Sequence, residues 1–135
     1  MGYNQIETAV GTYIRDQYHR AVEVGFGGKT IAAEIIMAAG IPVLCTDVHP
    51  YPDTPVPSVV DDVFTPTLSL YTGADVIYAI RPGTEIIPPL MDLARRINAD
   101  LIVYHLGFEL YENGGERIFV ENILLHRYIR AARAQ

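Results

Sequence analysis

Val22-Glu23-Val24-Gly25-Phe26-Gly27-Gly28-Lys29-Thr30 is the stretch that decides the fold of this 135-residue chain. A short apolar run, residues 21–24, predicts a β-strand, and the glycines follow it directly. Glycine after a strand permits positive φ and close approach by a ligand, and a following helix offers free N–H groups. The stretch therefore predicts a strand, a ligand-binding loop and a helix.

The rest of the chain alternates between helical and strand-like patterns. Apolar residues recur with a helical period from Tyr3 to His19, where Asn4 followed by Glu7 resembles a capping box. Further helices are predicted over residues 30–39 and 84–97, with a brief one from Thr65 towards Gly73. Strands are predicted at 41–46, 59–60, 75–80, 101–106 and 117–120. Four prolines in 49–58 exclude a regular helix there, and residues 123–132 fit strand and helix equally.

This order predicts an α/β, Rossmann-like domain, with a mostly parallel sheet and helices on both faces. No repeat or linker divides residues 1–135, so we expect a single compact domain. In such sheets the ligand crevice lies beyond the carboxyl ends of the strands. The candidate site residues are therefore Gly25 to Gly28, Asp47, His49, Asp61, Asp62, Arg81 to Glu85 and His105.

Composition and charge argue against several classes of function. The net charge of −6 and the lack of a Lys/Arg stripe argue against nucleic-acid binding. Arg127, Arg130 and Arg133 are spaced three apart and predict one solvated helical face. No apolar run reaches the roughly 18–20 residues that a bilayer requires, and the N-terminus does not resemble a signal peptide. With Cys45 as the one cysteine, these features indicate the cytoplasm.

The glycine-rich loop admits three interpretations. Gly28-Lys29-Thr30 matches the end of a phosphate-binding P-loop, but Glu23 stands where the first glycine is required. Gly25 and Gly27 also fit a dinucleotide-binding fingerprint, and Asp47 follows at the spacing of a ribose-binding acid. Position 30 is Thr, however, rather than the Gly or Ala of that fingerprint.

In the third interpretation, the apolar-Glu-x-Gly-x-Gly pattern after an N-terminal helix resembles the first motif of class I S-adenosylmethionine-dependent methyltransferases. This resemblance implies that Glu23, Gly25 and Gly27 hold the methionine part of the cofactor, with Phe26 and Gly28 in the same loop. It further implies that Asp47 binds the ribose and that Asp61 or Asp62 lies near the adenine. The whole chain is similar to a small archaeal family of uncharacterised Rossmann-like proteins. The markers are Val-Glu-Val-Gly-x-Gly, Thr46-Asp47 and Tyr78-x-Ile80-Arg81-Pro82-x-x-Glu85.

Two departures from the methyltransferase pattern bear on the reaction. Lys29 stands where a third glycine is common. The fourth strand ends in Ile80-Arg81-Pro82-Gly83, not in the Asn/Asp-Pro-Pro-aromatic motif that serves methylation of base amines. We instead expect Arg81, with Pro82, Glu85 and His105, to bind a small anionic substrate. The structural alternative is that Arg81 and Glu85 pair with each other.

The sequence thus predicts a binder of a nucleoside-containing cofactor, and the resemblance implies that this cofactor is S-adenosylmethionine. Whether the protein also transfers a methyl group to a small anionic substrate is left open. The alternatives are a non-catalytic regulatory or scaffold Rossmann domain and a small NAD-binding oxidoreductase. Only 29 residues follow Leu106, which leaves little room for the antiparallel hairpin and insertions that methyltransferases usually carry. We therefore expect weak or lost catalysis, or a substrate site completed by another subunit of a homo-oligomer. No ligand spacing supports a metal site of Asp47, His49 and Asp61.

Overall fold

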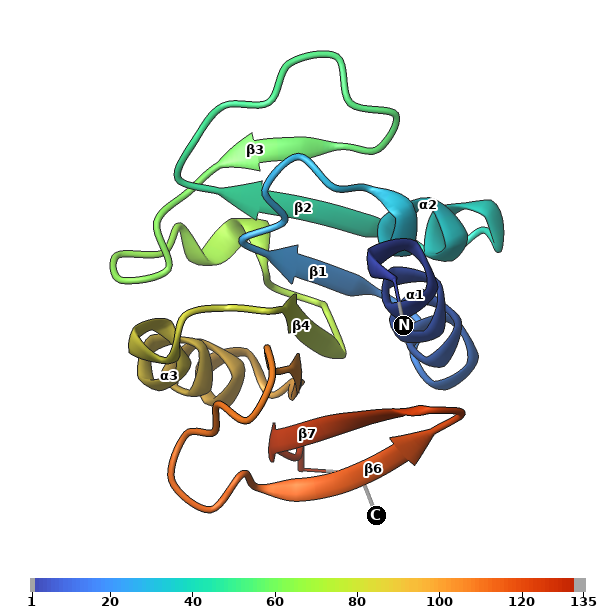
Figure 1. Ribbon diagram of the computed structural model, residues 1–135. Helices are drawn as coiled ribbons and strands as arrows, with labels where there is room; N and C mark the ends of the chain where they lie inside the picture. The colour runs from blue at the N-terminus through green and yellow to red at the C-terminus, as the bar shows by residue number, and fades with distance from the viewer. Residues whose placement is uncertain (1, 133–135) are drawn as a thin grey trace.

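A computed structural model describes residues 2–132 (Figure 1). Its strands form one sheet in the order β3-β2-β1-β4-β5-β7-β6. They are β1 (Ala21–Val24), β2 (Val43–Asp47), β3 (Ser58–Val60), β4 (Val76–Ile80), β5 (Asp100–Tyr104), β6 (Glu116–Val120) and β7 (Ile123–Ile129). The α-helices are α1 (Tyr3–Gln17), α2 (Ile31–Ala38) and α3 (Ile87–Ile97), with 3-10 turns η1 (Leu68–Leu70) and η2 (Thr84–Ile86). The predicted Rossmann-like α/β architecture is confirmed.

The sheet is parallel from β3 to β5 and ends in an antiparallel hairpin. β7 pairs antiparallel with both β5 and β6. The residues after Leu106 therefore suffice for the hairpin, and our expectation that they were too few was wrong. A turn of only two residues, Glu121 and Asn122, joins β6 to β7. The positive φ of Glu121, 51°, allows the chain to reverse within this short turn.

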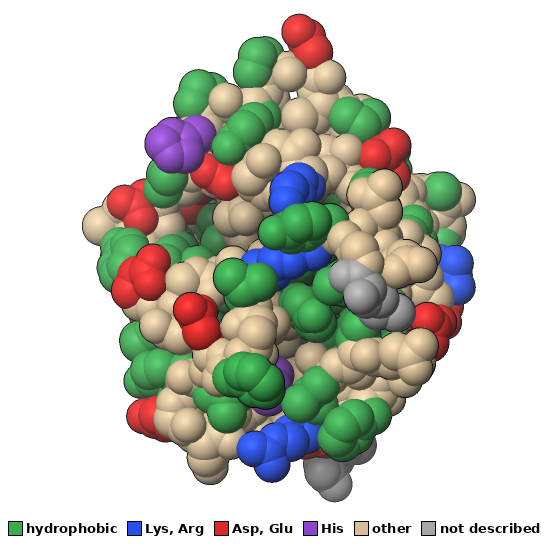
Figure 2. Space-filling model, in the orientation of Figure 1, with side chains coloured by type: hydrophobic (Ala, Val, Ile, Leu, Met, Phe, Trp, Pro, Cys, Tyr) green, Lys and Arg blue, Asp and Glu red, His purple; other side chains and the backbone are tan. Residues whose placement is uncertain are grey.

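Helices cover both faces of the sheet, as predicted. α1 and α2 pack together on one face, where Ile14 and Ile36 are fully buried, and α3 covers the other with Leu90 and Leu93 (Figure 1). α1 lies so close to α2 that a Cβ at Gly11 would be 2.8 Å from the Ala32 backbone. The side of the molecule seen in Figure 2 is hollowed near its centre, where basic side chains lie among hydrophobic ones.

The first helix begins at Tyr3, as predicted, but two predicted helix caps are wrong. α1 is capped two residues earlier than predicted, at Gly2, whose N–H donates to Gln5 Oε1 (3.0 Å). Asn4 therefore lies inside the helix and forms no capping box with Glu7. Thr65 starts no α-helix, and only the short η1 turn forms before Gly73. Local hydrogen bonds hold this segment as a loop, since Asp62 accepts the Phe64 N–H (2.9 Å).

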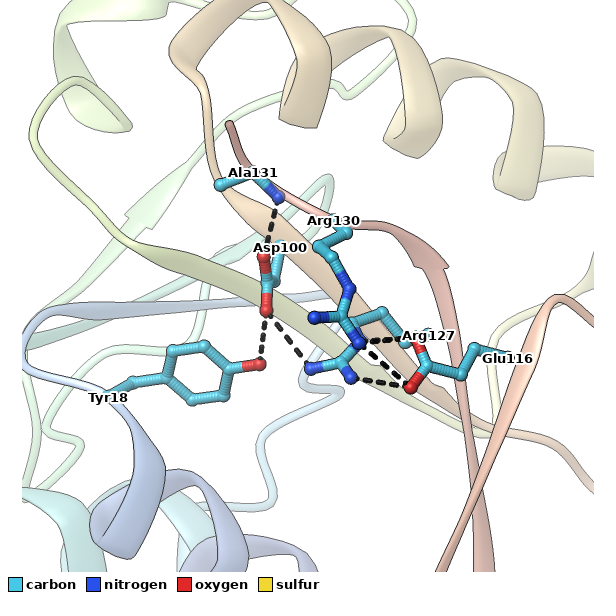
Figure 3. A network of polar contacts seen from close by, with 6 residues as sticks. All are labelled: Tyr18, Asp100, Glu116, Arg127, Arg130 and Ala131. Atoms are coloured by element: carbon cyan, nitrogen blue, oxygen red, sulfur yellow. Dashed lines mark hydrogen bonds and ion pairs between the residues drawn. The ribbon is translucent and has the colours of Figure 1, made fainter. Parts of the chain in front are cut away.

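The C-terminal arginines lie on and just after a strand rather than on a helix, so the predicted solvated helical face is wrong; Arg133 lies outside the described residues. Figure 3 shows Arg127 between two carboxylates, with Nη1 3.3 Å from Asp100 and Nη2 2.7 Å from Glu116. Arg127 faces Glu116 because the two residues are paired across β6 and β7. This network links the hairpin to the amino end of β5, opposite the edge where ligands are expected.

Candidate ligand-binding site

The switch point of the sheet lies at β1. This strand pairs with β2 on one side and β4 on the other, with Glu23 opposite both Cys45 and Tyr78. The chain therefore continues from β1 to β2 on one side and later returns to form β4 on the other side of β1. This reversal opens a crevice at the carboxyl ends of the strands. Gly25 and Arg81 follow β1 and β4 and flank this crevice.

The residues of the glycine-rich loop divide into two groups. Gly25 and Gly27 adopt φ of 71° and 62°, and a Cβ on either would meet no atom within 4 Å. A Cβ on Gly28 would instead lie 2.9 Å from the Tyr51 ring, which also packs edge-on against the buried Phe26. Gly25 and Gly27 therefore leave space for a ligand, whereas Phe26 and Gly28 hold the proline-rich loop, residues 49–57, in place.

Asp47 joins the end of β2 to this loop. Its Oδ2 accepts the Gly27 N–H (2.9 Å) and its Oδ1 accepts the His49 N–H (3.0 Å). The carboxylate is thus fixed beside the open face of the loop, where ribose hydroxyls could reach it. Its role in ribose binding stays a prediction.

A pocket of about 350 Å³ lies between the glycine-rich loop, the proline-rich loop and β3. A pocket of this size falls in the range of small-molecule sites. Phe26 and Tyr51 contribute aromatic walls, and Val59 and Val60 supply apolar surface from β3. The walls therefore suit a flat apolar group better than a phosphate.

Asp61 and Asp62 follow β3, as predicted, but their carboxylates already accept local hydrogen bonds. Asp61 accepts the Tyr71 hydroxyl (2.7 Å), whereas Asp62 is exposed and caps the turn at Phe64. Contact with an adenine through either residue stays a prediction.

Glu23 points into the protein towards α1. Its side chain is 1% exposed, and its Oε1 accepts the Tyr78 hydroxyl (2.8 Å). Burial raises the pKa of Glu23 to about 8, against the opposing effect of the Tyr78 hydrogen bond. Glu23 is therefore protonated over most of the neutral range.

Arg81 leaves β4 with a positive φ of 55° and turns towards α1. Its Nη1 lies 3.5 Å from Glu7 Oε1, and its guanidinium lies 4.2 Å from the centre of the Tyr3 ring. The alternative, a pairing of Arg81 with Glu85, is wrong, because the Glu85 carboxylate folds against Gly83 and the partner of Arg81 is Glu7. Lys29 Nζ lies 4.1 Å from the same Tyr3 ring, so two cations share it.

His105 follows β5 next to Arg81, but its side chain belongs to a different neighbourhood. Its Nε2 lies 2.6 Å from the Tyr128 hydroxyl, beside a separate pocket of about 270 Å³ at the hairpin. Burial, and then nearby His126, lower the pKa of His105 to about 4. The structure thus brings Arg81 to the crevice, together with the buried Pro82, and leaves His105 at the hairpin.

Sequence patterns missed Glu7, Tyr3 and Tyr51. A signal for Glu7 was present, because it shares the apolar stripe of α1 with Val10 and Ile14 and is itself 2% exposed. An acid in such a stripe needs a partner from elsewhere in the fold. That partner, Arg81, is distant in sequence.

Comparison with known proteins assigns the chain to a family. Residues 5–122 match the model of an uncharacterised protein family, UPF0146. The chain belongs to this family. A UPF0146 protein of Pyrococcus horikoshii is 32% identical over 114 residues, covering 81% of this chain and 87% of the relative. One from Archaeoglobus fulgidus is 34% identical over 99 residues, covering 70% and 74%. The predicted archaeal family of uncharacterised Rossmann-like proteins is therefore confirmed.

Solved structures share the fold of this UPF0146 chain at low sequence identity. A SAM-dependent methyltransferase from Archaeoglobus fulgidus superposes with a TM-score of 0.54 at 12% identity, covering 81% of this chain and 56% of its own. The methyltransferase SibL gives 0.55 at 17% identity, covering 84% and 38%. A Rhodobacter sphaeroides protein assigned to the Zn-dependent alcohol dehydrogenases gives 0.56 at 12%, covering 74% and 47%. The chain thus spans about half the length of these proteins, and the likeness shows the fold alone.

Residues 2–132 contain neither a membrane-spanning helix nor a cluster of metal-ligating side chains. No helix there combines the length and apolarity that a membrane crossing requires. No three His, Cys, Asp or Glu side chains in this range gather as a metal site.

Proposed function

We propose that the chain binds S-adenosylmethionine at the carboxyl ends of β1, β2 and β4. The observation that carries the proposal is the meeting of Asp47 with the glycine-rich loop, through its hydrogen bond to Gly27 N–H. Open space beyond Gly25 and Gly27 allows a ligand to approach the backbone. A fixed carboxylate beside that space is the acceptor that two ribose hydroxyls require.

The adenine has a matching place in this proposal. The neighbouring pocket, between Tyr51 and Val59, offers aromatic and apolar walls on the side of the loop towards β3. Asp61 and Asp62 follow the same strand and are our candidates for polar contacts with the base. Methyltransferase neighbours such as the Archaeoglobus fulgidus enzyme support the choice of cofactor.

The P-loop interpretation finds less support. A P-loop lysine must reach the terminal phosphates, whereas Lys29 extends over the Tyr3 ring at the start of α1. NAD remains the competing ligand, since it shares the ribose and the glycine pattern. An anionic methyl acceptor at Arg81, Pro82, Glu85 and His105 would need Arg81 to leave Glu7, so the proposal covers cofactor binding and assigns no acceptor.

Thermal-shift measurements with four ligands test the proposal. S-Adenosylmethionine or S-adenosylhomocysteine at 100 times its dissociation constant should stabilise the protein by about 2.7 kcal/mol. NAD and ATP with magnesium serve as matched nucleotides and should give smaller shifts. A shift with ATP and magnesium alone would revive the P-loop, and a shift with NAD alone would favour the oxidoreductase.

A further inference from the structure

We infer that Glu7 and Arg81 form a subsite for a zwitterionic α-amino-acid group. In S-adenosylmethionine and S-adenosylhomocysteine this group is the end of the ligand opposite the adenine. The inference rests on the proposed function and adds residues from α1 and β4 to the site.

The first observation is a pair of unsatisfied polar atoms. Glu7 Oε2 and Arg81 Nη2 are both buried without a hydrogen-bond partner among the described residues, and the two side chains are only 2% and 10% exposed. Buried polar atoms nearly always have partners, because leaving one unpaired is costly. One of these atoms accepts and the other donates, so a ligand that satisfies both must carry a donor and an acceptor close together. An α-ammonium and an α-carboxylate on one carbon have that arrangement.

The charge of the cluster also favours a zwitterion over a simple anion. Glu7 and Arg81 already form an ion pair at 3.5 Å, and burial raises the pKa of the neighbouring Glu23 so that it adds little charge. A phosphate or a lone carboxylate at Arg81 would face the Glu7 carboxylate and leave an uncompensated charge in a buried place. A zwitterion adds no net charge and gives each side chain an opposite partner.

The position of the pair suits the far end of the proposed cofactor. Glu23 and Tyr78 are the last residues paired between the parallel strands β1 and β4. The glycine-rich loop follows β1 and Arg81 follows β4, so both leave the sheet at its carboxyl edge. Tyr3, the first residue of α1, lies over the Arg81 guanidinium and is 57% exposed. Its ring is therefore the group that must move for an amino-acid end to enter.

Calorimetry with two ligands tests the inference on the unaltered protein. S-Adenosylhomocysteine carries the amino-acid group, whereas 5′-methylthioadenosine keeps the nucleoside and thioether and lacks it. We expect the first to bind about ten- to hundredfold more tightly, the range for hydrogen bonds to charged groups. The Arg81 Nε–Hε resonance should shift with S-adenosylhomocysteine and not with 5′-methylthioadenosine.

Arg81→Lys and Glu7→Gln should each remove most of this preference and leave 5′-methylthioadenosine binding within about twofold. The matched control is the exposed Asp92–Arg96 pair on α3, where Asp92→Asn and Arg96→Lys should change neither affinity. Equal binding of both ligands to the parent would overturn the subsite and keep the proposed function. Binding of neither ligand would overturn both. If a variant fails to fold, the parent affinities and the Arg81 resonance still decide.

Discussion

At the scale of single residues, Glu23 is a carboxyl group that the fold keeps from water on a buried strand. Its pKa rises from 4.5 to about 8 on folding, so the unfolded chain loses its proton first as the pH rises. Stability is then fully present below pH 4.5 and is lost as the pH rises towards 8. Glu23→Gln imitates the protonated carboxyl and should remove this loss.

We expect Glu23→Gln to stabilise the protein at pH 8 by on the order of 2–4 kcal/mol, since one pKa unit corresponds to about 1.4 kcal/mol. Urea unfolding at pH 5 and pH 8 measures the effect, which should be small at the lower pH. The exposed Glu85→Gln is the control. Equal stability of parent and Glu23→Gln at pH 8 would show that Glu23 is ionised at little cost.

His105 has the opposite dependence on pH. Its pKa falls from 6.5 to about 4 on folding, so the unfolded chain takes up a proton that the buried imidazole does not. Stability from this residue is therefore present above pH 6.5 and declines as the pH falls towards 4. The loss should amount to at most about 3 kcal/mol.

His105→Gln should flatten the dependence of stability on pH between 6.5 and 4. The amide oxygen of the new side chain can still accept a hydrogen bond from the Tyr128 hydroxyl. His49→Gln, at an exposed histidine, should leave the slope unchanged. The measurement is the free energy of unfolding at half-unit pH steps. A slope that persists in His105→Gln would assign the effect to another group.

Asp47 is the residue on which the nucleoside proposal depends most directly. If it accepts both ribose hydroxyls, Asp47→Ala should weaken S-adenosylhomocysteine binding by about 1.5–3 kcal/mol, the scale of hydrogen bonds to a charged group. Asp47→Asn can still accept the Gly27 N–H and separates loop support from ribose binding. Unchanged affinity of folded Asp47→Ala in calorimetry would remove Asp47 from the site.

At the scale of elements, the contact between α1 and α2 depends on one glycine. A methyl group at Gly11 would lie 2.8 Å from the Ala32 Cα and carbonyl oxygen, and backbone cannot move as a side-chain tip can. Gly11→Ala gains up to about 1 kcal/mol of helix propensity but overpacks the contact, which typically costs 1–3 kcal/mol. We expect a net destabilisation of about 1–2 kcal/mol in thermal unfolding. Gly2→Ala, which meets no atom within 4 Å, should be nearly neutral, and a stabilised Gly11→Ala would show that the helices can separate.

The elements were largely predictable because each strand carries its own apolar pattern. The last segment was ambiguous between strand and helix in the sequence. Ile123, Leu125 and Arg127 share one face of β7, but only the pairing of β7 with β5 and β6 fixes the segment as a strand. The helix predicted at Thr65 failed for a related reason, since neighbouring carboxylates offered its backbone N–H groups a local alternative. Local patterns thus identify strands well and helix starts less well.

At the scale of the whole molecule, topology alone selected the edge of the sheet where Gly25, Asp47 and Arg81 converge. The direction in which each side chain points was beyond a sequence pattern. Arg81 turns back to Glu7 on α1, and His105 turns to Tyr128 on the hairpin, although β4 and β5 are neighbours. Such choices depend on contacts between segments that are far apart in the chain.

The network in Figure 3 joins the end of α1 to β5, the hairpin and the segment after β7. Asp100 is 1% exposed and accepts bonds from Tyr18 at the end of α1 (2.6 Å), Ala131 N–H (2.7 Å) and Arg127 (3.3 Å). Arg127→Met leaves the Asp100 carboxylate buried without its cation, and breaking a buried pair in this way costs about 3–5 kcal/mol. Arg130, whose side chain is 55% exposed, contacts only Glu116 in this network, so Arg130→Met should cost less than about 1 kcal/mol.

Urea unfolding followed by two probes tests whether Arg127→Met costs more stability than Arg130→Met, and whether the loss extends to the whole fold. Asp100, the first residue of β5, holds the end of α1 and the segment after β7 together. Arg127→Met should therefore lower the urea midpoint equally by Tyr fluorescence and by far-ultraviolet circular dichroism. A drop confined to one probe would mean that the hairpin unfolds separately from the parallel sheet. Similar costs for Arg127→Met and Arg130→Met would mean that Asp100 finds water or another partner when Arg127 is lost, and the network would then add little to the stability of the fold.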